Sequence, residues 1–227
     1  MQITNPPPDG PKPARGPGAL TTDREQVRGA LVRQWSLIVA ALPTVQLHRP
    51  SRCEGWQNQE VLAHLCLQPI LLRGFLATAS ARPPRITLGA NLSGTRSLAA
   101  LIDSSAREGA GAARVDFAKA TADALPELWA ADLSVTVVTM QGPILLADYL
   151  VTRCVEAVVH GMDIVEPVEP DPVARDITAE ALIEVLALRA PHLVPGAREL
   201  PPSVWIEVAT GRRSAPNRLA GAVPVMT

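Results

Sequence analysis

The sequence predicts a mostly α-helical protein. Hydrophobic residues make up 47% of the 227-residue chain, whereas aromatic residues make up only 3%. A core with so few aromatics has to be built from Ala, Leu and Val, which suits closely packed helices better than a many-stranded β fold. Apolar residues also recur at helical spacing in several segments, and prolines and glycines separate those segments.

The first 20 residues differ from the rest of the chain. They hold six prolines and three glycines, and we expect a disordered leader there. Thr22 and Glu25 then fit a capping box that begins the first helix, and Pro43 ends it. The chain carries no apolar stretch typical of a secretory signal near its start.

The remaining elements are predicted from the same helical spacing of apolar residues and from the prolines and glycines between segments. A second helix is expected over 57–79, where Pro69 should kink or split it because proline removes a backbone donor. We expect loops at 44–56 and 82–97, further helices at 98–107, 113–131, 144–165 and 178–190, and short strands at 134–140 and 203–209.

A proline- and acid-rich connector suggests how the chain divides. The segment reads EPVEPDP from residue 166. We therefore expect a helical bundle over 21–165, a linker over 166–174 and a short α+β C-terminal appendage over 175–227.

One predicted helix carries a polar row among apolar residues. Within YLVTRCVEAVVHGMD, the polar residues recur at steps of four, three, four and three, which places them on one helical face. Because such a narrow polar row faces inward, its charges need partners or a metal. The row consists of Tyr149, Arg153, Glu156, His160 and Asp163.

Two Glu/His pairs at i, i+4 indicate a metal site: Glu60 with His64, and Glu156 with His160. Both pairs together would form a dinuclear centre, but such centres use an i, i+3 spacing and additional glutamates. A mononuclear site of His64, Glu156 and His160 is preferred, because it needs no additional glutamates. Two imidazoles and one carboxylate suit Zn²⁺ and leave a position open, although the same set also serves Fe(II).

Other polar residues nearby have simpler interpretations. Arg153, Asp163 and Tyr149 are expected to support the site or the fold, and Glu60 is expected to face solvent in the first turn of its helix. Cys66 and Cys154 lie two residues from a candidate ligand, about 200° around the helix, and point away from it. A purely structural Arg–Glu–His network is a further interpretation of the row.

Two segments resemble the mycothiol-dependent maleylpyruvate isomerase family. They read SRCEGWQNQEVLAHL from residue 51 and DYLVTRCVEAVVHGMD from residue 148, and the resemblance extends from Thr22 to Val165. It implies a DinB-like four-helix bundle in which His64, Glu156 and His160 hold a divalent metal, most often zinc. It also implies that mycothiol, activated at the metal, adds to an electrophile, either in thiol transfer or in cis–trans isomerisation of maleylpyruvate.

The C-terminal part departs from that family. The isomerase carries a domain similar to sterol carrier proteins, and residues 175–227 are too few for all of it. No catalytic residue is assigned, and Arg212, Arg213 and Arg218 are expected to be exposed tail arginines. A non-catalytic metal- or ligand-binding bundle is therefore the alternative function.

The composition indicates which kinds of binding partner and which cellular compartment to expect. The net charge is −1, whereas nucleic-acid binders usually carry an excess of basic residues. No apolar run approaches the roughly 20 residues of a membrane span. Three cysteines without zinc-finger spacing suit a reducing compartment. We expect a cytoplasmic protein whose partners are a small thiol and an electrophilic substrate.

Overall fold

The computed structural model describes residues 23–94, 98–164 and 167–225. The predicted leader and Thr22 lie outside the described residues. The elements are α1 (Arg24–Ala41), α2 (Asn58–Leu76), α3 (Leu88–Ser93), α4 (Ala99–Gly109), α5 (Ala113–Ala130), β1 (Thr136–Thr139), β2 (Gly142–Leu145), α6 (Leu146–Asp163), α7 (Pro172–Arg189), α8 (Val194–Arg198) and α9 (Pro202–Ala209), with 3-10 turns at Ala110–Ala112, Pro191–Leu193 and Asn217–Leu219.

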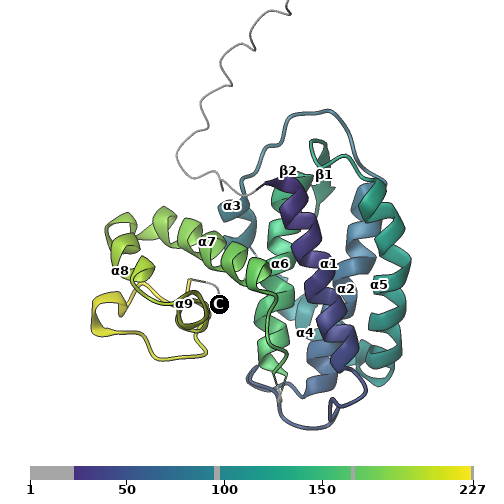
Figure 1. The fold of residues 1–227 in the computed structure, drawn as a ribbon, viewed down its shortest axis with the longest axis horizontal. Coiled ribbons are helices and arrows are strands. Elements are labelled where there is room, and N and C mark those ends of the chain that lie inside the picture. Colours follow the sequence, from purple (N-terminus) through teal and green to yellow (C-terminus); the bar gives the residue numbers. More distant parts are fainter. Residues whose placement is uncertain (1–22, 95–97, 165–166, 226–227) are drawn as a thin grey trace, which may run out of the picture.

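Four long helices form the bundle, which confirms the mostly α-helical prediction. Helix α1 packs on α6 and α2 packs on α5, while α2 also contacts α6 and α1 contacts α5. Helix α4 crosses one end of the bundle, and a β1–β2 hairpin lies toward the other end (Figure 1). None of the helices in the described segments combines the length and apolar character needed to cross a bilayer.

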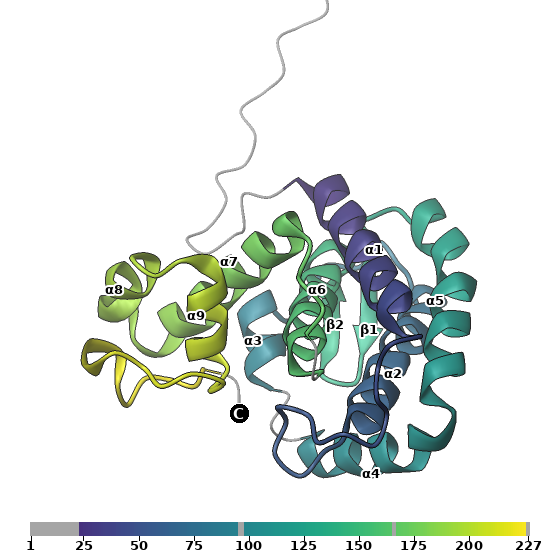
Figure 2. The same ribbon diagram turned by 60° about the horizontal axis from the view of Figure 1, so that its bottom comes forward.

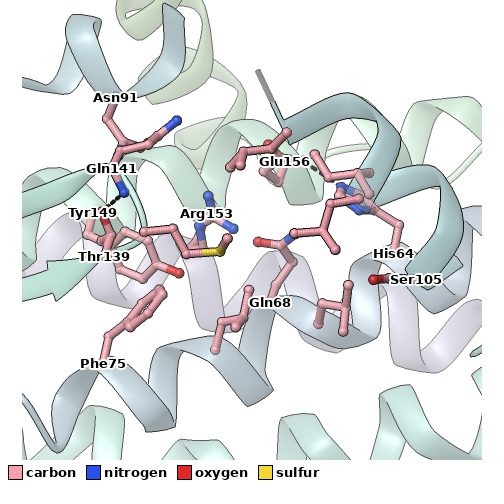
Figure 3. A pocket seen from close by; sticks show the side chains of 16 residues that line it. His64, Gln68, Phe75, Asn91, Ser105, Thr139, Gln141, Tyr149, Arg153 and Glu156 are labelled. Carbon is pink, nitrogen blue, oxygen red and sulfur yellow. Dashed lines mark hydrogen bonds and ion pairs between the residues drawn. The ribbon is translucent and has the colours of Figure 1, made fainter. Parts of the chain in front are cut away.

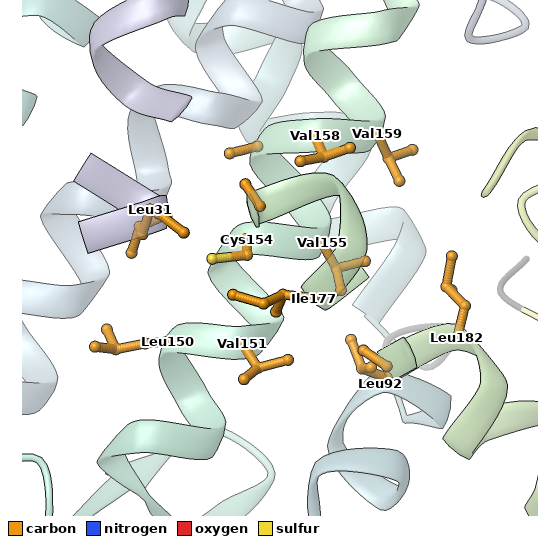
Figure 4. Packing of buried hydrophobic residues seen from close by; sticks show 14 of the residues in the cluster. Leu31, Leu92, Leu150, Val151, Cys154, Val155, Val158, Val159, Ile177 and Leu182 are labelled. Atoms are coloured by element: carbon orange, nitrogen blue, oxygen red, sulfur yellow. The ribbon is translucent and has the colours of Figure 1, made fainter. Parts of the chain in front are cut away.

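Helix α6 lies at the centre of the molecule. Its apolar side chains contact Leu31 of α1, Leu92 of α3, and Ile177 and Leu182 of α7 (Figure 4). Burial of such side chains stabilises the fold by roughly 2 kcal/mol each. The apolar contacts leave the polar row of α6 facing α2.

Helix α7 joins the C-terminal part to the bundle. It begins at Pro172, earlier than the predicted residue 178, because Asp171 caps it by accepting hydrogen bonds from the backbone of Val173 and Ala174. Helix α7 packs against α6, α1 and α3, and α8 and α9 pack on α7 (Figure 2). The division into a bundle, a linker and an appendage with a sterol-carrier-like remnant stays a prediction.

Several local predictions were wrong. Residues 203–209 form helix α9 rather than a strand, and helix α3 lies within the predicted loop 82–97. Pro69 was predicted to kink or split its helix, and of these two alternatives the split was wrong, because α2 continues through Pro69. Strand β2 occupies residues expected to begin the α6 helix, and it pairs antiparallel with β1, which lies inside the predicted strand. The short elements α3, α9, β1 and β2 have too few residues for periodicity to identify them reliably.

Candidate metal centre

The three candidate ligands meet between α2 and α6. His64 Nε2 lies 3.0 Å from Glu156 Oε2, and His160 Nε2 lies 3.4 Å from the same oxygen. All three ligand atoms lie within 4.8 Å of one another. The side chains of His64 and Glu156 are only 7% and 11% exposed, and a dashed line joins them in Figure 3. The structure thus brings together two imidazoles and one carboxylate from distant parts of the chain.

The donor atoms fit a small divalent cation. In a tetrahedral site with bonds of about 2.0–2.1 Å, neighbouring ligand atoms are separated by roughly 3.3 Å. The observed separations of 3.0 and 3.4 Å are close to this value. Nitrogen, nitrogen and oxygen donors suit Zn²⁺ and leave one position for an external group.

Asp163 holds His160 from the other side of its ring. His160 Nδ1 lies 2.9 Å from Asp163 Oδ2, so that Nε2 of the same ring faces Glu156. A carboxylate on the far nitrogen fixes the orientation of a ligand imidazole and increases its basicity. Of the predicted supporting residues, Asp163 thus forms a direct hydrogen bond with a candidate ligand.

Arg212 pairs with Asp163 and is not an exposed tail residue as predicted. Its Nε and one Nη donate to the two Asp163 carboxylate oxygens at 2.9 and 2.6 Å. Arg52 also anchors this region, since its backbone amide donates to the Asp163 carbonyl at 2.9 Å. The C-terminal segment is thereby connected to the candidate centre through a fully buried carboxylate.

Cys53 belongs to the same cluster, which its spacing in the sequence does not predict. Its Sγ lies 3.1 Å from Asp163 Oδ2 and 3.7 Å from His160 Nδ1. Cys53, His160 and Asp163 form a second group whose geometry could hold a metal. Because the Arg212 guanidinium already occupies both Asp163 oxygens, a cation there would meet a like charge. We therefore interpret Cys53 and Asp163 as residues that hold the His160 ring in position and not as metal ligands.

The pKa directions follow from burial and from the hydrogen bonds of this arrangement. Burial opposes the charge of Glu156, but hydrogen bonds with His160 and His64 outweigh burial and hold its pKa well below the ordinary value. Burial lowers the pKa of His64. Burial also opposes protonation of His160, yet its hydrogen bonds with Asp163, Cys53 and Glu156 raise its pKa well above the usual range.

The Gly55-Trp56 turn covers the two imidazoles. Gly55 adopts φ +77°, a left-handed conformation that favours glycine. The turn places the Trp56 ring 5.7 Å from the His64 ring and 6.4 Å from the His160 ring, measured between centroids. Trp56 Nε1 donates to Asp103 of α4 at 2.8 Å, which anchors the cover.

The remaining predicted residues belong to neither group of possible ligands. Glu60 is buried and accepts a hydrogen bond from the backbone of Gln57, so the expectation of a solvent-facing Glu60 was wrong. Since Glu60 joins neither group of possible ligands, the dinuclear alternative lacks its second carboxylate. Arg153 and Tyr149 line a cavity that begins beside Glu156.

The fold and this cluster together define a helical-bundle domain with a candidate metal centre. The sequence matches the family of the mycothiol maleylpyruvate isomerase N-terminal domain over residues 28–165, which is more than half of the chain. The chain belongs to that family, as its sequence motifs predicted. Searches of curated proteins and of solved structures returned no match.

Proposed function

We propose that the protein is a divalent-metal-dependent enzyme that activates a small thiol of the mycothiol type for addition to an electrophile. The convergence of His64, Glu156 and His160 within 4.8 Å is the observation that carries the proposal. Membership of the mycothiol maleylpyruvate isomerase family supports a thiol cosubstrate. Zinc is the metal best suited to this donor set.

The chain's own residues prepare the site. Asp163 holds the His160 ring, and Glu156 supplies a negative charge that balances a bound cation. The Trp56 ring lies beside both imidazoles. A bound zinc ion would supply positive charge that lowers the pKa of a thiol at the open position.

The proposed reaction is addition of sulfur to an electrophilic carbon. In an isomerase, the new C–S bond converts a double bond into a single bond, which rotates before the thiol is expelled. In a transferase, the thiol adduct itself is released. We also propose a cytoplasmic location, because Cys53, Cys66 and Cys154 are free thiols and a reducing compartment keeps a thiol cosubstrate reduced.

Metal content tests the ligand set directly. Protein purified without chelator and without a nickel column should hold about one metal ion per chain by mass spectrometry, which is the stoichiometry of a mononuclear three-ligand site. His160→Ala should lose the ion while keeping the helical circular dichroism spectrum. An absence of metal in the wild type, even after incubation with zinc or iron, would reject the ligand set.

Thiol turnover tests the catalytic part of the proposal. With mycothiol and an activated chromogenic alkene, the wild type should form the thioether, and Glu156→Gln should form it at the uncatalysed rate. Glu54→Gln is a matched control, since Glu54 is exposed in the neighbouring loop. Bound metal without turnover on any thiol and electrophile pair would favour the alternative of a non-catalytic binding module.

A further inference from the structure

A cavity extends from the candidate metal centre along the helices. It has a volume of about 220 Å³ and lies between α2, α4, α6 and the tip of the β1–β2 hairpin. His64 and Glu156 stand at one end, and Thr139 and Gln141 stand toward the other (Figure 3). Its wall is mainly apolar, formed chiefly by Leu67, Leu71, Phe75, Leu101, Ile102 and Met140. Such a wall suits the apolar body of a ligand.

Arg153 is a buried cation in this apolar wall. The residue is 8% exposed, and its guanidinium stacks 4.7 Å from the Tyr149 ring centroid. Its Nε donates to Thr152 Oγ1 at 3.1 Å. Its two Nη groups donate no hydrogen bond to a described residue, and no carboxylate in the described segments forms an ion pair with it. A buried charge without a counter-ion is costly, and a ligand anion would remove that cost.

Two further polar groups beside Arg153 are also unpartnered. Gln68 is 2% exposed, and its Oε1 is buried without a hydrogen bond. The Tyr149 hydroxyl is buried and likewise lacks a partner within the described structure. Both side chains line the cavity, and Figure 3 shows Arg153 between Tyr149 and Glu156. The guanidinium and the hydroxyl are donors for oxygen atoms of a ligand, whereas Gln68 Oε1 is an acceptor for a donor group of the ligand.

We propose that this cavity binds the electrophilic substrate and that the substrate is an organic acid with an apolar body. Its carboxylate accepts hydrogen bonds from the Arg153 guanidinium and the Tyr149 hydroxyl. Arg153 precedes Glu156 by three residues, or about 4.5 Å along the helix axis, which places the carboxylate a few bonds from the reacting carbon. A short diacid would leave the apolar length of the cavity unfilled. This inference rests on the proposed function, since it names the substrate class of the same site.

Direct binding of octanoate tests the acid site. Calorimetric titration should detect binding to the wild type, and Arg153→Met should weaken it by about tenfold or more because a charge-assisted hydrogen bond is lost. Binding of 1-octanol, which has the same chain and no charge, should be equal in both proteins. Equal octanoate affinity in wild type and Arg153→Met, or no binding to the wild type at millimolar concentration, would overturn the proposal.

Three variants keep the test decisive. Arg198→Met removes an exposed arginine that pairs with Glu180 away from the cavity, and it should bind octanoate like the wild type. If Arg153→Met does not fold, Tyr149→Phe replaces it, with a several-fold weaker octanoate affinity expected and an unchanged affinity counting against the proposal. His160→Ala should lose metal yet keep octanoate binding, so failure of the metal centre and failure of the acid site are separate results.

Discussion

At the scale of single residues, Asp163 determines how the candidate centre is arranged. Its fully buried carboxylate contacts His160, Cys53 and Arg212 at the same time. Burial opposes its charge, but the hydrogen bonds from His160 and Arg212 outweigh burial and hold its pKa far below the ordinary value. Asp163 therefore stays ionised and keeps one nitrogen of His160 occupied, so that the other nitrogen faces Glu156 and His64.

Replacing Asp163 should weaken metal binding. In Asp163→Asn the negative charge on the far side of His160 is lost, and we expect zinc affinity to fall by about 10–100-fold. Competition with a chromogenic chelator measures the affinity. Asp176→Asn is the control, because Asp176 is an exposed partner of Arg175 outside the cluster. Equal zinc affinity in Asp163→Asn and wild type would contradict a role for Asp163 in holding His160.

The three thiols should differ in reactivity. Burial raises the pKa of Cys66 to about 11, and burial raises the pKa of Cys154 further still. Because the thiolate is the nucleophile, these two should resist iodoacetamide at pH 7.5, whereas half-buried Cys53 should react. Mass spectrometry should find one modified thiol per folded chain and none in Cys53→Ser. Modification of Cys66 in the native protein as fast as Cys53 would refute this ranking.

At the scale of elements, α6 combines two functions in one helix. One face packs against α1, α3 and α7, and the other presents polar side chains to α2 and the cavity. The start of α7 is held next to it, because Gln34 of α1 accepts a hydrogen bond from the Asp171 amide and reaches the Ala157 carbonyl. The position of the α6 polar row thus depends on its apolar neighbours.

The cap of α7 should contribute measurably to stability. Asp171→Ala removes the side-chain acceptor of Val173 and Ala174, and we expect a loss of about 1–2 kcal/mol in the free energy of unfolding. Asp171→Asn keeps a capping acceptor and loses only the ion pair with the half-exposed Arg33, so its loss should be below about 1 kcal/mol. Denaturant unfolding at pH 7 measures both values. Equal losses in the two variants would mean that the cap is not the stabilising contact.

The contribution of Asp171 should also depend on pH. Burial opposes its charge, but the hydrogen bond from Arg33 and the backbone hydrogen bonds of the cap prevail and lower its pKa in the folded state. Its stabilisation is therefore complete above the unfolded pKa of about 3.9 and is lost as the pH falls through the lower folded value. The difference in unfolding free energy between wild type and Asp171→Ala should shrink between pH 5 and pH 2. A difference that grows in acid would contradict this sign.

At the scale of the whole molecule, the candidate centre connects regions that are distant in sequence. His64 and Glu156 are 92 residues apart, and Asp163 and Arg212 are 49 residues apart. A cation held by the three ligands would cross-link α2 to α6 in the folded state alone. Ligand binding of this kind shifts the folding equilibrium toward the native state.

Zinc should therefore stabilise the entire fold. At a free concentration 100 times its dissociation constant, the free energy of unfolding should rise by about 2.7 kcal/mol, which shifts the melting temperature by several degrees. Thermal scans with zinc and with chelator measure the shift. His160→Ala should show the same melting temperature in both conditions. A zinc-dependent shift of equal size in that variant would locate the metal elsewhere.

The local parts of this structure could be predicted from the sequence. Each long helix repeats its apolar residues at helical spacing, and the polar row of α6 lies within one helix, so both are visible without tertiary information. Asp followed by Pro is also a sequence signal for the start of a helix, and Asp171 and Pro172 carry it. The neighbouring prolines of the connector instead led to the prediction of a linker at these residues. Helices α3 and α9 have six and eight residues, which is too short for a clear period.

The sequence by itself therefore determined the helical class, the family and the candidate ligands His64, Glu156 and His160, because these depend on local spacing and on short motifs. Only the tertiary structure decided that Cys53 and Arg212 converge on Asp163 and that Glu60 joins neither group of possible ligands. It also decided that Arg153 lies in a cavity where no described carboxylate pairs with it. The physical reason is that each of these contacts depends on how the helices pack against one another, and long-range packing leaves no periodic signal in the chain.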